Sequence, residues 1–136
     1  SARIPVFVAA RAFSPVESFL IAFDGGKSID KAIDFAVNRP LLKGATAHLV
    51  AVGKPDTPLQ QSLESAAAKL REAGYVVEAN LLPGDPDDVI AAEVENRGID
   101  LLVMGAYGHS RIRYLVIGST TTNLVRSCKV PALLFR

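Results

Sequence analysis

The chain has little of what several protein classes require. Cys128 is its only cysteine, which excludes an internal disulfide and favours a reducing, cytoplasmic compartment. No apolar run reaches the roughly 18 residues that a membrane-spanning helix needs, so no membrane partner is expected. No charged segment followed by an apolar stretch opens the sequence, so no secretory signal is predicted. What is present is 136 residues, 49% of them hydrophobic, which suffices for one domain with its own core.

Acidic residues are missing from the C-terminal third of the chain. All 14 of them precede Leu101, although the net charge of the whole chain is only +1. The basic residues of that third are Arg111, Arg113, Arg126, Lys129 and Arg136. A locally basic segment suggests a nearby anion, most simply phosphate; a solvated surface is the plainer alternative. Nucleic acid is not an expected partner, because it would need a wider basic surface with exposed aromatic residues.

Short apolar stretches alternate along the chain with segments in which apolar residues recur at helical spacing. Helical stripes begin at Ile29 and Leu59, and a further helix is predicted from about Ser119. Asp85 and Pro86 are the residue types of an N-cap and a first helical position, so another helix is predicted to begin there. The apolar stretches predict strands at residues 19–23, 45–52, 75–82, 101–104 and 130–135.

This alternation predicts an α/β fold of the Rossmann-like kind, with an open parallel five-stranded sheet, order 3-2-1-4-5, and helices on both faces. The first and fourth strands are apolar throughout, as strands buried on both faces are. Glu78 and Asn80 give the third strand the polar alternation of an edge. Ligands of such sheets bind beyond the carboxyl ends of the strands, where the strand order reverses. The crevice is therefore predicted between Asp24 and Gly105.

The first 17 residues do not follow this pattern. The segment SARIPVFV at 1–8 resembles SCKVPALL at 127–134, with serine, a basic residue, a β-branched residue and proline in register. An internal match of this kind suggests a repeat. We therefore predict that residues 1–17 are the closing strand and linker of a preceding copy, and that residues 18–136 form the domain.

A long segment with spaced glycines, the glycine loop (residues 105–120), follows the fourth strand. Gly105 ends that strand where a side chain would block the crevice, and Gly108 can adopt the positive φ that turns an amide inward. Gly118 precedes a helix whose first amides, with the hydroxyls of Ser119 and Thr120, suit a phosphate. Outer phosphates would be within reach of His109, Arg111 and Arg113. The plainer alternative is that each glycine forms a turn and that Ser119 only caps the helix.

Taken together, the spacing of Gly, two residues, Gly, nine residues and Gly-Ser resembles the ATP-binding motif of the universal stress protein family, whose fold is adenine nucleotide α-hydrolase-like. The resemblance covers residues 18–136, from FLIAFDG at 19–25 to the Val-Pro at 130–131. It implies a ribose contact from the aspartate, an adenine contact from backbone at the end of the second strand, and phosphates on the glycine loop. The nucleotide-binding residues that it implies are Ala22, Asp24, Val50, Met104, Gly105, Gly108, Gly118, Ser119 and Thr120. Gly26 stands where many relatives have serine, so a first-loop hydroxyl contact is not expected.

Other roles are open for some of these residues. Asp24 could simply form a turn, and Met104 could fill the core. Gly-Lys-Ser at 26–28 invites a phosphate-loop interpretation, but the first glycine of that motif would fall at Ile21, inside a strand. The Ser-Gly-Gly-x-Asp-Ser loop of ATP pyrophosphatases is a second near match, in which Asp24 replaces the leading serine and no aspartate precedes Ser28. Lys27 and Ser28 are better explained as the first turn of a helix.

No catalytic or metal site is predicted. His48 lies among apolar neighbours and is expected to be structural, so the two histidines give neither a Ser-His-Asp set nor a zinc site. The acidic residues at 85–88 suit a helix start, and Cys128 falls on the inward stripe of its helix. Without a positioned general base, any ATP hydrolysis should be slow.

The expected function is an ATP-binding sensor or scaffold of the stress response, with Mg²⁺ carried on the phosphates. The alternative is an assembly module of the same fold that binds no nucleotide. The resemblance implies that the closing strand of such a module pairs with a second universal stress protein-like domain, in tandem or as a homodimer. Residues 4–8 are therefore expected to lie antiparallel beside residues 130–135, in the place of that partner.

Overall fold

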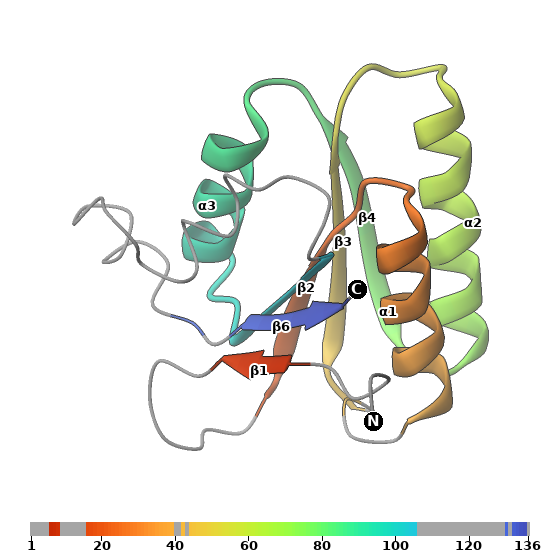
Figure 1. The fold of residues 1–136 in the computed structure, drawn as a ribbon, viewed down its shortest axis with the longest axis vertical. Helices are drawn as coiled ribbons and strands as arrows, with labels where there is room; N and C mark the ends of the chain where they lie inside the picture. The colour runs from red at the N-terminus through yellow and green to blue at the C-terminus, as the bar shows by residue number, and fades with distance from the viewer. Residues whose placement is uncertain are drawn as a thin grey trace.

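The computed structural model describes residues 6–8, 16–39, 42, 44–105, 130 and 132–135. The predicted strands are confirmed to within two residues, and so are the starts of the first three helices. The helix predicted from Ser119 lies outside the described residues. The elements, in chain order, are β1 (Val6–Val8), β2 (Ser18–Ala22), α1 (Lys27–Asn38), β3 (Thr46–Val52), α2 (Pro58–Glu72), β4 (Val76–Leu82), α3 (Pro86–Asn96), β5 (Leu101–Gly105) and β6 (Ala132–Phe135) (Figure 1).

The strands form one sheet in the order β1-β6-β5-β2-β3-β4. Strand β2 pairs in parallel with both β3 and β5, and β3 pairs in parallel with β4. The run β4-β3-β2-β5 is the predicted order 3-2-1-4, so the open parallel sheet is confirmed. Strand β6 continues the sheet in parallel beside β5.

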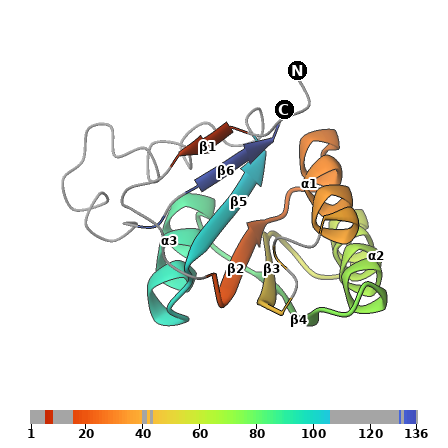
Figure 2. The same ribbon diagram turned by 90° about the horizontal axis from the view of Figure 1, so that it is seen from below.

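Helices cover both faces of this sheet, with α1 and α2 on one side and α3 on the other (Figure 2). Alternate residues of a strand point to opposite faces, so β2 contributes to two cores. Phe19 and Ile21 pack in the larger core with α1 and α2, while Leu20 packs in the smaller core with Ile90 and Val94 of α3. Because both faces are covered, a continuous apolar run is needed in β2 and β5, as the sequence indicated.

Side chains and turn geometry fix where several elements begin. The Asp85 carboxylate accepts a hydrogen bond from the Asp88 amide at 3.3 Å, which confirms the predicted N-cap of α3. The Asp100 carboxylate accepts from the amides of Glu17 and Ser18, at 2.9 and 3.2 Å. This contact ties the start of β2 to the start of β5, so their carboxyl ends meet at the same edge.

Strand β1 pairs antiparallel with β6. Phe7 lies opposite Leu133, with Val6 opposite Leu134 and Val8 opposite Ala132. This confirms the predicted pairing for residues 6–8; the other residues of 4–8 lie outside the described ranges. Positions 7 and 133 are also equivalent in the sequence match between 1–8 and 127–134, so the pairing has a local twofold symmetry.

Candidate functional site

A cavity of about 260 Å³ lies at the carboxyl ends of β2 and β3, between the first turns of α2 and α3. It lies at the predicted edge of the sheet but on the β3 side of Asp24, whereas the crevice was predicted between Asp24 and Gly105. Three of the predicted site residues line the cavity: Val50 of β3, Ala22 of β2 and Asp24 of the loop after β2. The full lining is Ala22, Phe23, Asp24, Val50, Val52, Leu59, Pro86 and Ile90.

Asp24 is the charged residue of this lining. Its Oδ1 accepts a hydrogen bond from the Gly26 amide at 2.8 Å, and Gly25 between them has a φ of 76°. Asp24 therefore does form a turn. Its Oδ2 has no hydrogen-bond partner among the described residues, and a carboxylate oxygen of this kind can accept from a ligand donor.

Val50 forms part of the cavity wall with its side chain, which is 1% exposed. Its carbonyl accepts a hydrogen bond from the Phe23 amide at 2.9 Å. A carbonyl oxygen has two lone pairs, so a further donor would have to use the second one.

Met104 and Gly105 lie at the end of β5 and do not line this cavity. Met104 is 2% exposed and packs in the α3-side core, which is the alternative role that the sequence left open. A Cβ placed on Gly105 would lie 2.9 Å from the Ser28 Cβ, closer than side chains approach each other. Packing alone thus explains why a glycine stands at position 105, because the first turn of α1 lies against the end of β5.

A model of the Universal stress protein family matches residues 15–136. The chain belongs to the universal stress protein family. A universal stress protein of Synechocystis is 40% identical over 134 residues, which make up 97% of this chain and 47% of that protein. A universal stress protein of Methanocaldococcus jannaschii is 25% identical over 77 residues, which make up 57% of this chain and 48% of that protein. The chain thus spans about half the length of the Synechocystis relative.

Solved structures of universal stress proteins share the fold. One in complex with cAMP has a TM-score of 0.67 and 26% identity, covering 90% of this chain and 98% of its own. An Arabidopsis thaliana family member with AMP bound has a TM-score of 0.60 and 20% identity, and the match covers 87% of this chain and 89% of that one. One from Archaeoglobus fulgidus has a TM-score of 0.69 and 21% identity, and covers 100% of this chain and 50% of its own.

Most of the glycine loop of this universal stress protein domain lies outside the described residues. The predicted site residues in that part are Gly108, His109, Arg111, Gly118, Ser119 and Thr120. Their roles toward phosphate stay predictions. Within the described ranges, no group of three His, Cys, Asp or Glu side chains could hold a metal ion, and no helix is long and apolar enough to cross a membrane.

Sequence reasoning missed several residues of the cavity wall. Val52 follows Val50 by two positions and so lies on the same face of β3. Pro86 and Ile90 come from α3, and Leu59 comes from the first turn of α2. Strand alternation could have indicated Val52, but the contributions of the two helices depend on how these pack against the sheet.

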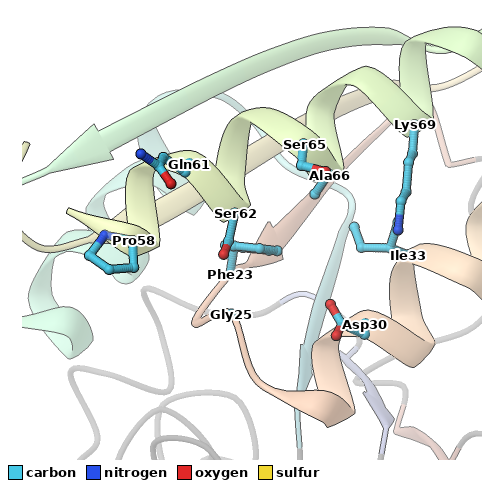
Figure 3. Close-up of a pocket in the computed structure, with 10 residues that line it drawn as sticks. All are labelled: Phe23, Gly25, Asp30, Ile33, Pro58, Gln61, Ser62, Ser65, Ala66 and Lys69. Carbon is cyan, nitrogen blue, oxygen red and sulfur yellow. The ribbon is translucent and has the colours of Figure 1, made fainter. Parts of the chain in front are cut away.

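A second cavity, of about 350 Å³, lies between α1 and α2 (Figure 3). Ser62, Ser65 and Lys69 of α2 and Asp30 of α1 line it, and all four are exposed. Phe23 lines both cavities, so the loop after β2 separates this groove from the cavity at the strand ends. The sequence did not indicate the groove, because it depends on the spacing between two helices.

His48 is buried on β3, 7% exposed, as expected for a structural histidine of the universal stress protein domain. Burial lowers the pKa of its imidazole, and Arg97 lowers it further, whereas Glu78 and Glu93 act in the opposite direction. His48 does not line either cavity.

Proposed function

We propose that this domain binds ATP, with the adenine in the cavity at the ends of β2 and β3 and the ribose at Asp24. One observation carries the proposal: Asp24, which has one carboxylate oxygen without a partner among the described residues, lines a cavity whose other lining side chains are apolar. The cavity lies at the strand carboxyl ends, where open α/β sheets bind ligands.

The chemistry of the wall suits a nucleoside. Ala22, Phe23, Val50, Val52 and Ile90 offer apolar contacts to a flat ring. The Asp24 Oδ2 can accept from a ribose hydroxyl while Oδ1 keeps its bond to the Gly26 amide. At about 260 Å³ the cavity is at the small end of ligand sites, so it would hold the base and sugar while the phosphates extend beyond it.

The phosphates would lie on the glycine loop. Amides at Gly108 and from Gly118 to Thr120 are the donors that the motif offers, and Arg111 would meet the outer phosphates. Mg²⁺ would bind through the phosphates, as it does in most nucleotide sites. Family members with bound cAMP and AMP support an adenine nucleotide as the ligand class. A role as a stress-response sensor or scaffold follows from reversible binding of this kind.

Calorimetric titration with ATP, AMP and cAMP tests the proposal. Asp24→Asn keeps the turn acceptor and removes the charge, so it should weaken ATP binding about tenfold, equivalent to ~1.4 kcal/mol. Gly118→Val should abolish ATP binding in a domain whose circular dichroism is unchanged. Lys27→Ala is the matched control. It alters the exposed first residue of α1 and should leave the affinity unchanged, whereas a phosphate loop at 26–28 would be disabled by it.

Unchanged ATP affinity in both Asp24→Asn and Gly118→Val would contradict the proposal. Mass spectrometry of the purified protein gives an independent test, since a nucleotide of the right class should copurify with it.

We propose further that the chain is the second half of a two-domain protein, which gives it an assembly role beside or instead of nucleotide binding. Two relatives support this, since nearly the whole chain matches only 47% of the Synechocystis protein and 50% of the Archaeoglobus fulgidus chain. The pairing of β1 with β6 about equivalent positions of a sequence repeat supports it too. Strand β1 would then be the closing strand of the first domain.

The assembly role predicts a change of oligomeric state when β1 is detached. Phe7→Pro places a proline at the centre of β1, which disfavours regular strand pairing, and should free the edge of β6 for a second copy. Light scattering after gel filtration should then show a dimer where the unaltered chain is a monomer. Pro5→Ala, which changes a residue next to the pairing and removes no donor, is the control. An unchanged mass for Phe7→Pro would contradict this role.

A further inference from the structure

His48 carries an unusual polar atom. Its Nδ1 is buried and has no hydrogen-bond partner, and it is the one such side-chain atom that the described residues contain. Burying a polar atom without a partner destabilises a fold, so an atom of this kind calls for a physical explanation.

Three charged side chains face His48. Glu78 lies opposite it on β4, with its Oε1 3.9 Å from Nδ1, too far for a hydrogen bond. The same oxygen accepts from an Arg97 guanidinium nitrogen at 3.1 Å, and Arg97 also donates to the Glu93 carboxylate at 2.7 Å. On the other side of His48, β2 presents the apolar Leu20.

These four residues, His48, Glu78, Glu93 and Arg97, form what we call the His48 cluster. Glu93 belongs to the last two turns of α3, and Arg97 is the residue that ends this helix. The cluster therefore joins β3 and β4 to the C-terminal end of α3. Its ion pairs lie partly in solvent, and the neutral imidazole beneath them is almost fully buried.

A proton on His48 would disturb this arrangement. The imidazolium has two N–H donors, and the Glu78 oxygen that lies 3.9 Å from Nδ1 already accepts a hydrogen bond from Arg97. A buried positive charge also needs water or a full set of acceptors. Glu78 is the carboxylate near enough to balance this charge, and turning it toward His48 strains its bond to Arg97 at the end of α3.

We propose that uptake of a proton by His48 releases the C-terminal end of α3 from the sheet, so that mild acid opens this side of the domain. The other end of α3 contributes Pro86 and Ile90 to the wall of the strand-end cavity. Release of α3 thus couples proton uptake by His48 to the shape of that cavity. Coupling to nucleotide affinity rests on the proposed function, whereas release of α3 does not.

The sign and size of the effect follow from linkage. Since burial lowers the pKa of His48 below its value in a solvated state, the open form binds the proton more readily than the closed form. The population of the open form is therefore constant above about pH 6.5, the ordinary histidine pKa, and rises as the pH falls below it. One proton can raise it by at most about tenfold per pH unit.

Amide hydrogen exchange of residues 91–97, corrected for the intrinsic effect of pH, measures this opening. We expect opening of these amides to increase several-fold between pH 7.5 and pH 5.5, with the amides of β2 unchanged. The chain has two histidines, so their imidazole NMR signals can be followed separately. His48→Phe keeps a ring of similar size and should abolish the acid response, and His109→Gln, which removes the other histidine, should leave it intact.

Glu78→Gln is a second variant, useful if His48→Phe does not fold. It removes the carboxylate that favours the charged imidazole in the closed form, so the acid response should still begin at about pH 6.5 and become larger at low pH, while opening at pH 7.5 increases. The same acid response in His48→Phe as in the unaltered chain would overturn the proposal, and so would titration of His48 without a change at residues 91–97. If α3 opens but ATP affinity is the same at both pH values, the device stands and its coupling to the cavity is wrong.

Discussion

Gly105→Ala tests the contact that joins the end of β5 to the start of α1. The added Cβ would lie 2.9 Å from the Ser28 Cβ, and the next nearest atom is the main-chain nitrogen of Ile29 at 3.8 Å. Ser28 Cβ is fixed to the backbone of α1, so the clash cannot be relieved by turning a side chain. The first turn of α1 must shift instead, which costs about 1–3 kcal/mol, the usual range for overpacking.

Urea and thermal unfolding of the variants measure this cost. For a domain of this size 1 kcal/mol corresponds to a Tm change of roughly 4 °C, so Gly105→Ala should lower Tm by about 4–12 °C. Ser28→Gly is the matched partner, and alone it should cost only about 0.5 kcal/mol through helix propensity. In the double variant the clash is absent, so the pair should be more stable than Gly105→Ala alone.

The sequence offered another reason for this glycine, namely that a side chain would block the crevice. On that reasoning Gly105→Ala would impair ligand binding with little loss of stability, and Ser28→Gly would rescue nothing. Additive effects of the two substitutions on the free energy of unfolding would refute the packing argument developed here.

Two other substitutions test how the elements are held. Tyr75→Phe removes the buried hydrogen bond, 2.6 Å long, that the Tyr75 hydroxyl donates to the Ala36 carbonyl. It should lower the free energy of unfolding in urea by about 1 kcal/mol, and an unchanged urea midpoint would mean that the bond makes no net contribution to stability. Asp85→Ala removes the N-cap of α3 and should destabilise the domain by about 1 kcal/mol, while Asp85→Ser retains a capping oxygen and should restore most of it; equal losses in the two variants would show that the cap is not the cause.

Much of the candidate site follows from the sequence. Asp24 ends an apolar run, and the carboxyl ends of neighbouring parallel strands meet at one edge of a sheet, so a crevice there is determined by the strand order. The position of Val50 follows from the same reasoning. The roles of Met104 and Gly105 were harder to predict, because strand alternation alone does not tell which face carries the ligand. The structure places Met104 in the core and Gly105 against α1.

Local patterns thus determined the elements of this protein. Apolar runs, helical stripes and the Asp85-Pro86 cap act over a few residues, and the length of the connections requires parallel strands with helices between them. Even the pairing of β1 with β6 was expected, from the internal sequence match together with the family resemblance.

Only the tertiary structure decided which side chains meet across elements. The cavity wall from α2 and α3, the groove between α1 and α2, and the contact of His48 with Glu78 and Arg97 depend on the packing angles and distances of whole helices against the sheet. Those angles and distances are set by the shapes of all the side chains packed in the two cores, and no single segment of the sequence determines them.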